Sequence, residues 1–343
     1  ASMPLPEVSH KRVVLLFDCD CFYAQCEMLE HPEWRKKPLA IKQKYLVVTC
    51  NYVARKSGVR KLQSLEDAKL RCPDLIIVDG SDLTKYRAVS MRVFNVLKRF
   101  GGAAAKHERL GMDEVFVDVT RAAEEDREDE PRLMGHLFQP DPAAVRAART
   151  LRAELNFREA PAADAKAEQS DSGSEDGDWV RDYRETASPD DAKAALADEQ
   201  LCDCGCQKRL ARASKIAAEA RMALFKEIGL TVSCGVSTSK MLAKIAAGLN
   251  KPNKQTTLLP QHALALVHAL PTRVIPGLGF GVASALRELH PPVFTCADLA
   301  REGVRPLERL LRATLKSPPA GLAKDLWQRS LACDTDAVKP FSG

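Results

Sequence analysis

The sequence lacks any long apolar run. No segment reaches the roughly 18 uninterrupted apolar residues that a membrane-spanning helix needs. The N-terminal stretch ASMPLPEVSHKR has no apolar core of the kind that a secretion signal carries. Internal repeats are absent as well. These absences argue against a membrane protein, a secreted protein and a repeat array.

The cysteines do not form the even set of a disulfide framework. There are 11 of them, and several lie in apolar surroundings, as Cys19, Cys50 and Cys234 do. This distribution favours reduced thiols in a cytosolic or nuclear protein. What the chain does have is material for folded cores. Its 343 residues are 45% hydrophobic and 28% charged, enough for two or three domains of roughly 100–200 residues each.

Charge is divided unevenly along the chain. The net charge is +5, but residues 121–200 hold 11 Lys/Arg against 21 Asp/Glu, a net of −10. The remainder therefore carries +15. A basic body around an acidic insert suggests a polyanionic partner, with nucleic acid the first candidate, although a solvated basic surface would look the same.

Periodicity and breakers predict a mixed α/β order. Strands are expected at 12–18, 38–41, 45–50, 115–119 and 230–236, and helices at 19–29, 51–57, 63–71, 81–100, 207–227 and 238–249. Residues 121–200 predict a helical start and then a mobile acidic loop around 160–195. A compact helical module is expected over 261–333. The order is typical of a palm interrupted by a small insert and followed by a thumb.

Carboxylates stand at the ends of two predicted strands. Asp18 ends one apolar run, and Asp113 and Glu114 directly precede another. Buried carboxylates are costly unless they are paired or bind cations. Two such strands side by side could hold two metal ions for phosphoryl transfer, with the carbonyl of Cys19 as a further oxygen ligand. Asp20 is better read as a turn or helix-cap residue whose side chain points away from Asp18.

Four longer motifs give these carboxylates a context. FDCDCFYAQCE, TCNYVARKSGV, LGMDEVFVDVT and SCGVSTSKMLAKIAAGLNKPN occur in that order. The series resembles the Y-family of translesion DNA polymerases over nearly all of 10–120 and 210–335. Residues 43–62 and the form LGMDE, in place of the commoner Ser-x-Asp-Glu, resemble one branch of that family in particular.

The resemblance implies an α+β polymerase right hand, with a palm sheet, small fingers, a helical thumb and an acidic insert within the palm. The implied domains are palm 1–39, 101–120 and 209–258, fingers 40–100, a partly disordered insert 121–208, thumb 259–335, and the start of a linker at 336–343. The family's C-terminal little finger would begin there. We therefore expect a catalytic core without the little finger and without regulatory tails.

The resemblance also assigns site residues. Asp18, Asp113 and Glu114, with the Cys19 carbonyl, would hold two Mg²⁺ ions, for which Mn²⁺ can substitute. Tyr23 would be a steric gate beneath the sugar that excludes the 2′-OH of ribonucleotides. The residues that would bind the triphosphate are Thr49, Tyr52, Arg55, Lys61 and Lys251.

Two further sets concern the DNA. Gln43, Lys44, Leu46 and Val48 match positions that form a narrow lid over the templating base, which implies low fidelity that depends on the template base. The stretch IPGLGFG at 275–281 resembles a helix-hairpin-helix. Its glycines, Gly277, Gly279 and Gly281, would let backbone N–H groups bind DNA phosphate without reading sequence.

One motif departs from the family pattern, and the resemblance assigns no role to a cysteine cluster or to the histidines. Ser-Thr-Ser-Lys at 237–240 replaces the usual Asn-Lys before the next helix. Cys202, Cys204 and Cys206 form a C-x-C-x-C cluster. Zinc sites usually pair two C-x₂₋₄-C units, and no second pair lies near, so a surface turn of thiols is expected. Five histidines show no ligand spacing and are expected to be structural: His31, His107, His136, His262 and His268.

The favoured function is a template-directed DNA polymerase acting in DNA damage bypass. A palm-type nucleotide cyclase or metal phosphohydrolase is the first alternative, against which the gate aromatic, NYVAR and KPN speak. The second is a non-catalytic DNA-damage scaffold, against which the intact carboxylates and Arg55 speak. Expected partners are primer-template DNA and dNTP, and a sliding clamp and other translesion factors through C-terminal regions. We expect a nuclear monomer without membrane contact.

Overall fold

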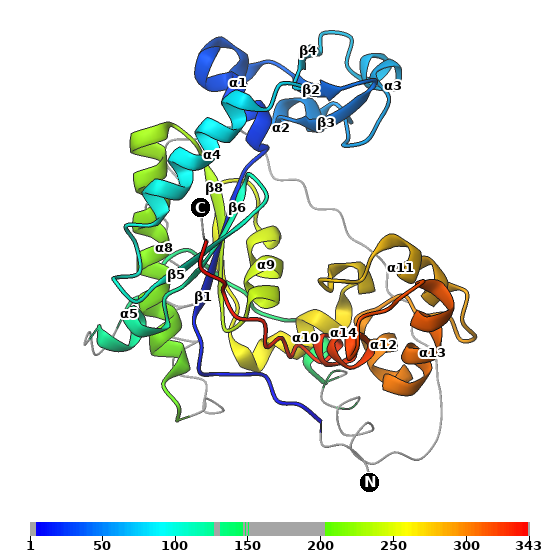
Figure 1. The fold of residues 1–343 in the computed structure, drawn as a ribbon. Helices are drawn as coiled ribbons and strands as arrows, with labels where there is room; N and C mark the ends of the chain where they lie inside the picture. The colour runs from blue at the N-terminus through cyan, green and yellow to red at the C-terminus, as the bar shows by residue number, and fades with distance from the viewer. Residues whose placement is uncertain (1–4, 127–130, 147, 149, 151–202, 342–343) are drawn as a thin grey trace.

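A six-stranded sheet carries the largest core of the molecule (Figure 1). The computed structural model describes residues 5–126, 131–146, 148, 150 and 203–341, so the acidic loop expected around 160–195 lies outside the described residues. The strand order is β5-β6-β1-β8-β9-β7. The strands are β1 (Val14–Cys19), β5 (Lys106–Leu110), β6 (Glu114–Asp118), β7 (His136–Leu137), β8 (Val232–Ser237) and β9 (Gln255–Thr257).

The alternation of β1 explains its position inside the sheet. Leu15 and Phe17 face one side, where they join the core beneath the helices, while Val14 and Leu16 pack on the other side with Phe116. All of these side chains are at most 3% exposed. Because successive strand residues point to opposite faces, a strand that is apolar at every position must be covered on both.

Helices cover the two faces of this sheet. One face is packed by α4 (Thr84–Leu97) and α8 (Cys206–Ile228), and the other by α9 (Lys240–Leu249). The buried stripe of α8 repeats every three or four residues, as a helix facing a core requires: Leu210, Ala213, Ala217, Ala220 and Leu224. Helices α1 (Phe22–Glu30) and α5 (Thr120–Glu125) complete this large-sheet module.

Two segments pack on the large-sheet core although the domain bounds expected from the sequence place them elsewhere. Helix α4 was grouped with 40–100, but Tyr86, Phe94 and Leu97 are buried in the large-sheet core because the apolar face of α4 packs on α8. The expected insert, 121–208, begins with α5 and supplies β7, which pairs in parallel with β9. Part of the expected insert therefore belongs to the large-sheet module.

A three-stranded sheet forms a separate small-sheet module over residues 39–79 (Figure 1). Its strands are β2 (Leu39–Gln43), β3 (Leu46–Cys50) and β4 (Ile76–Asp79), in the order β3-β2-β4. Its helices are α2 (Tyr52–Lys56) and α3 (Leu65–Arg71), and a 3₁₀ turn, η1 (Pro32–Lys36), precedes it. The side chains of Asn51 and Ser64 accept hydrogen bonds from the first turns of the two helices, which fixes where each begins.

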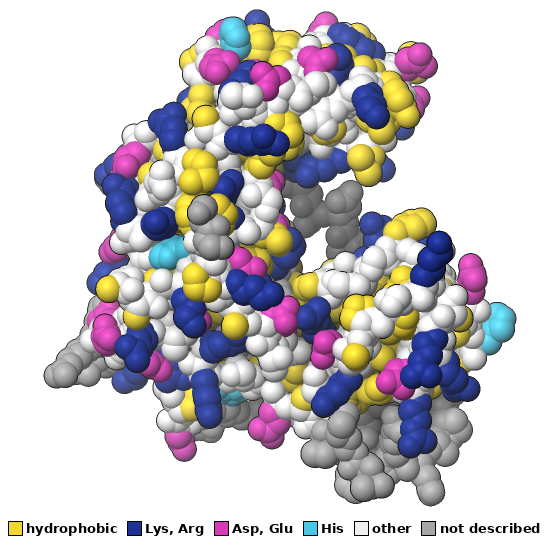
Figure 2. Space-filling view, in the orientation of Figure 1, with side chains coloured by type: hydrophobic (Ala, Val, Ile, Leu, Met, Phe, Trp, Pro, Cys, Tyr) yellow, Lys and Arg dark blue, Asp and Glu magenta, His cyan; other side chains and the backbone are white. Residues whose placement is uncertain are grey.

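A helical module over residues 260–330 carries its own core. It contains α10 (Pro260–Ala269), η2 (Thr272–Val274), α11 (Phe280–Arg287), α12 (Cys296–Glu302), α13 (Val304–Thr314) and α14 (Leu322–Ser330). The Trp327 Nε1 group donates to the Ala300 carbonyl at 3.0 Å, which joins α14 to α12. Figure 2 shows a wide notch between the small-sheet and helical modules.

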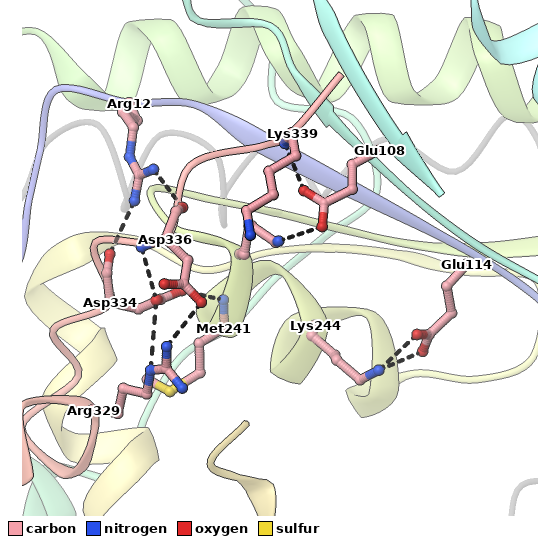
Figure 3. Close-up of polar contacts among 10 residues, drawn as sticks. Arg12, Glu108, Glu114, Met241, Lys244, Arg329, Asp334, Asp336 and Lys339 are labelled. Atoms are coloured by element: carbon pink, nitrogen blue, oxygen red, sulfur yellow. Dashed lines mark hydrogen bonds and ion pairs between the residues drawn. The ribbon is translucent and has the colours of Figure 1, made fainter. Parts of the chain in front are cut away.

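The segment after α14 returns to the large-sheet module. Arg12 donates to the carbonyls of Asp334 and Asp336, at 2.9 and 2.6 Å (Figure 3). The Lys339 N–H donates to Glu108 at 2.7 Å, and Val338 is buried in the apolar layer beside α9. The C-terminal segment thus fastens the helical module to the sheet.

Two features concern the cysteines and the apolar helices of the described residues. None of the cysteines in the described ranges takes part in a disulfide. No described helix is both long and apolar enough to cross a membrane.

Candidate active site

Strand pairing places two acidic residues side by side. Strands β1 and β6 are antiparallel, and their register sets Asp18 opposite Glu114. Both residues lie on the face that carries Leu16 and Phe116, because side chains two residues apart share a face. They therefore project toward α9 at the edge where β1 ends. Their side chains are 18% and 16% exposed, so each is screened from most of the solvent.

The turn between β5 and β6 brings in the third carboxylate. Gly111 begins this turn with a φ of +73°, a conformation that glycine adopts without strain, and Asp113 ends it. The Asp113 carbonyl accepts the Cys19 N–H at 2.9 Å, which ties the turn to the end of β1. Burial, and then the negative charges of Asp18 and Glu114, raise the pKa of Asp113. The three acids therefore repel one another in the absence of a cation.

Two lysines neutralise part of this charge. Lys251 forms an ion pair with Asp18. Lys244 of α9 contacts both oxygens of Glu114 at 2.7 Å, as Figure 3 shows. Among the described residues, Asp18, Asp113 and Glu114 do not gather their ligand atoms within 4.8 Å of one another. A divalent cation that bound here would replace the lysines as the partners of Asp18 and Glu114.

Asp20, a buried residue just after β1, joins β8 and the KPN turn. It is 1% exposed and accepts hydrogen bonds from Ser233 Oγ at 2.7 Å and from the Asn253 N–H at 2.8 Å. Burial raises the pKa of Asp20, and these hydrogen bonds act in the opposite direction. Asp20 was expected to be a turn or helix-cap residue. It lies in the turn after β1, but the N-cap of α1 is Cys21, and the Asp20 side chain instead joins the end of β1 to Ser233 of β8 and to the turn at Asn253.

A buried arginine holds the same turn. Arg221 of α8 is 4% exposed, and its guanidinium donates to the Asn253 carbonyl and to the Val232 carbonyl, the latter at 3.0 Å. Asn253 has a φ of +53°, so the turn needs such fixed partners to keep its shape. Arg221 and Asp20 together position the KPN turn, and with it Lys251.

Tyr23 lies against the carboxylates. Its ring packs edge-on to Tyr86 with centroids 4.5 Å apart, and its hydroxyl is 3.8 Å from Met112 Sδ, in the turn that carries Asp113. Burial, followed by the charge of Asp113, raises the pKa of Tyr23. The ring therefore packs between Tyr86 and the turn that carries Asp113.

The residues expected to bind the triphosphate differ in their surroundings and exposure. The Arg55 guanidinium lies 4.4 Å from the centre of the Tyr52 ring and donates to the Cys50 carbonyl at 3.2 Å. Lys61 is exposed, and its charge lowers the pKa of Asp113. Burial, and then the charge of Asp20, raise the pKa of Tyr52. Thr49 is buried on β3 at 4% exposure, which leaves little of its side chain accessible to a ligand.

The lid candidates form one hairpin of the small-sheet module. Gln43 pairs with Leu46 across β2 and β3, and Lys44 turns the chain with a φ of +53°. The Gln43 amide donates to the Gly80 carbonyl at 2.9 Å, and Val48 packs against Ile41. Gln43 and Val48 are thus held by contacts, while Lys44 is exposed.

The glycines expected in the thumb lie at and just before α11 in the helical module, and Figure 1 shows α11 apart from β1 and β6. Gly277 has a φ of +87°, and Gly279 is the N-cap of α11. A Cβ added at Gly279 would meet no atom within 4 Å, so the backbone there is open to an approaching group. The helix that precedes this hairpin is the short 3₁₀ turn η2.

Comparison with known proteins now identifies the family. The model of the family described as "IMS: impB/mucB/samB family" matches residues 17–248, which include the three carboxylates. The chain belongs to this family, the Y-family of DNA polymerases. Y-family DNA polymerases are metal-dependent.

The relatives agree with the branch that residues 43–62 resemble. DNA polymerase iota of Mus musculus is 34% identical over 98% of this chain and 38% of the mouse protein, and that of Homo sapiens is 38% identical over 84% and 32%. DNA polymerase IV of Ralstonia nicotianae is 29% identical over 87% of this chain and 59% of its own length. The chain thus spans about a third of the length of its iota relatives.

A solved structure has the same fold. The Y-family DNA polymerase chimera Dbh-Dpo4-Dbh superposes with a TM-score of 0.62, at 20% identity, over 96% of this chain and 70% of that one. The large-sheet, small-sheet and helical modules accordingly correspond to a palm, fingers and thumb. The α+β right hand predicted from the sequence is confirmed.

Sequence reasoning missed two residues of the site: Lys244, which pairs with Glu114, and Arg221, which holds the turn before β9. Lys240 and Lys244 are four residues apart on α9, and they pair with Glu108 and Glu114 of the sheet. That i, i+4 spacing of cations was the available signal. The Ser-Thr-Ser departure proved compatible with the same helix, because Ser239 caps α9 by accepting from the Leu242 N–H at 3.2 Å.

Proposed function

We propose that this protein is a template-directed DNA polymerase that adds dNTPs to a primer 3′-OH, with the low fidelity of translesion synthesis. One observation carries the proposal: in a chain of the Y-family, Asp18 lies opposite Glu114 across β1 and β6, and Asp113 ends the adjoining turn, against which Tyr23 packs. Such an edge suits the chemistry because phosphoryl transfer depends on positioning and charge stabilisation.

The donor set fits two hard divalent cations. Asp18, Asp113 and Glu114 supply carboxylate oxygens, and the Cys19 carbonyl stands at the same strand end. The raised pKa of Asp113 supports the fit, since a bound cation would relieve the repulsion among the acids. Two Mg²⁺ ions, which Mn²⁺ can replace, would supply Lewis-acid activation of the 3′-OH and charge neutralisation on the triphosphate.

The cationic residues would bind and orient the triphosphate. Arg55 offers a planar fork for two phosphate oxygens, and its packing on Tyr52 holds that fork in place. Lys251 would move from Asp18 to the phosphates once a cation neutralises that carboxylate. Lys61 adds an exposed positive charge at the mouth of the site, and Thr49 a minor contact from β3.

DNA would lie in the notch between fingers and thumb (Figure 2). The open backbone at Gly277, Gly279 and Gly281, with the N-terminus of α11, would hold a phosphate without reading sequence. On the other side, Gln43, Lys44, Leu46 and Val48 would cover the templating base. The anchored Gln43 supports a narrow lid, and hence fidelity that depends on the template base.

We also propose domain boundaries, a cellular location and further partners. We divide the chain into palm 1–39, 81–120 and 209–258, fingers 40–80 and thumb 259–335, with α4 placed in the palm for its packing on α8. The relatives come from animals, a plant and bacteria, so the nuclear location stays a prediction. Binding to a sliding clamp and a monomeric state are predictions as well.

Primer extension tests the proposal. Asp18→Asn and Glu114→Gln should each lower extension by at least about 100-fold while primer-template binding persists, because each removes a ligand charge. Asp118→Asn is the matched control, since Asp118 ends the same strand as Glu114 and its carboxylate binds Thr120 instead. Extension above a few per cent of wild type in either site variant would exclude this assignment. A chain that cyclised or hydrolysed nucleotides without extending a primer would exclude the polymerase.

A further inference from the structure

Three ligand-type side chains from distant parts of the sequence meet outside the polymerase site. His10 lies in the segment before β1, and Cys204 and Cys206 lie 194 and 196 residues later, at the start of α8. Their ligand atoms all lie within 4.8 Å of one another, and within the described residues no other group of three His, Cys, Asp or Glu does so. Cys202, the first cysteine of the cluster, lies outside the described residues.

The distances match those around one zinc ion. Each of the two Sγ atoms lies 3.6 Å from His10 Nδ1. With Zn–S bonds of about 2.3 Å and Zn–N bonds of about 2.0–2.1 Å at tetrahedral angles, a sulfur and a nitrogen on the same ion are about 3.5–3.6 Å apart. The spacing therefore leaves room for an ion between the three atoms without a change of backbone.

Local structure favours thiolates at this place. Gly205 turns the chain with a φ of +70°, so that the cysteines on either side of it both face His10. Cys206 is the first residue of the long helix α8, and the positive end of a helix stabilises a thiolate. Cys204 is exposed, so an ion could reach the site from solvent. Cys206 is 1% exposed, so water is excluded from its side of the site.

Arg209 holds the two chain segments in register. Its Nη1 donates to the Cys204 carbonyl at 2.7 Å, and its Nη2 donates to the His10 carbonyl, also at 2.7 Å. The guanidinium thus joins the N-terminal segment to the start of α8 through the ligand residues themselves.

We propose that His10, Cys204 and Cys206 bind one Zn²⁺ ion. Binding would release the two thiol protons, so that two thiolates balance the charge of the ion and neutral His10 supplies its nitrogen. The fourth coordination position would face the surface cavity that Cys204 and His10 share with Glu7, Lys11 and Gln261. The ion would cross-link the segment before β1 to the helix that follows the acidic insert. This site uses soft ligands and is separate from the carboxylates of the proposed polymerase.

Metal analysis of the intact chain tests the proposal. Protein purified from zinc-supplemented cells should hold about one zinc per chain, with a dissociation constant below about 1 μM against a chelator. Cobalt titration of the zinc-free protein should give the thiolate-to-cobalt charge-transfer band and the visible bands of a tetrahedral site. Cys204→Ser, at an exposed position that should not disturb folding, and Cys206→Ser should lose that band. His10→Ala should weaken binding at least about tenfold.

Matched variants separate this site from the polymerase site. His290→Ala, an exposed histidine of the helical module, and Asp18→Asn should both keep the zinc. Zinc below about a tenth of an equivalent in the wild-type protein would overturn the proposal. So would unchanged zinc in Cys204→Ser, loss of zinc in Asp18→Asn, or a disulfide between Cys204 and Cys206 in place of zinc. The result does not depend on primer extension, so a failure of the proposed polymerase would leave it standing.

Discussion

Lys244 contacts both carboxylate oxygens of Glu114 at 2.7 Å, in the position that a divalent cation would have to take. The lysine is 42% exposed, and an ion pair so open to solvent is worth at most about 1 kcal/mol. Lys244→Ala should therefore lower the Mg²⁺ concentration for half-maximal extension by up to about fivefold. Lys240→Ala, one turn earlier and paired with Glu108, is the control. An unchanged or higher Mg²⁺ requirement in Lys244→Ala would contradict the competition.

Asp113 should destabilise the metal-free protein at neutral pH. Its pKa is raised by burial and by Asp18 and Glu114, so the folded state holds the proton more tightly than the unfolded state does. Stability then falls as pH rises from the ordinary carboxyl range through the raised pKa. In EDTA, Asp113→Asn should melt a few degrees above wild type at pH 7.5, with the gap closing toward acid pH. Mg²⁺ should raise the melting temperature of wild type only. A lower melting temperature for Asp113→Asn at pH 7.5 would refute the argument.

Tyr23→Ala should admit ribonucleotides. The ring is fixed by Tyr86 and by the turn at Met112, so its removal opens space where a 2′-OH would otherwise clash. The preference for dATP over ATP should drop at least about tenfold, equivalent to 1.4 kcal/mol in the transition state. Tyr23→Phe keeps the ring and should keep the preference. If both variants discriminate like wild type, another residue provides the gate.

Arg55→Ala should lower kcat/KM for dNTP more than Lys56→Ala does. A charge-assisted hydrogen bond contributes about 1.5–3 kcal/mol, so kcat/KM for dNTP should fall at least about tenfold. Lys56→Ala, an exposed cation on the same short helix, should change kcat/KM little. Steady-state kinetics on one primer-template decides between them. Equal losses in the two variants would indicate a general charge effect and not a phosphate fork.

Gly279→Ala should weaken DNA binding without affecting the fold. Gly279 has an extended φ of −73° and open space around a Cβ, so alanine fits the free protein. A methyl group at the N-cap of α11 would nevertheless keep a phosphate away from the backbone N–H groups there. Binding at low salt should weaken several-fold, with an unchanged melting temperature. Gly248→Ala, with equally open space in α9, is the control. Wild-type affinity in Gly279→Ala would exclude this hairpin from DNA contact.

The sequence predicted those elements whose own residues specify them. Strand β1 follows from a run of apolar residues, and α8 from a buried stripe at helical spacing. The carboxylates, Tyr23 and Arg55 were found through motifs whose order marks the family. Strands β5 and β9 could not be predicted in this way. KHERL and QTT show no apolar alternation, and they become strands only because β6 and β8 offer unpaired backbone groups beside them.

The tertiary structure alone decided which residues meet. Asp18 and Glu114 each stand out in the sequence, but their pairing depends on the register of β1 and β6. Lys244 is an ordinary surface lysine until α9 packs over that edge. His10 carried no signal at all, since its partners Cys204 and Cys206 lie on the far side of an acidic insert. Local sequence records which conformation a segment prefers, whereas a site made by segments almost 200 residues apart exists only once their shared core has packed.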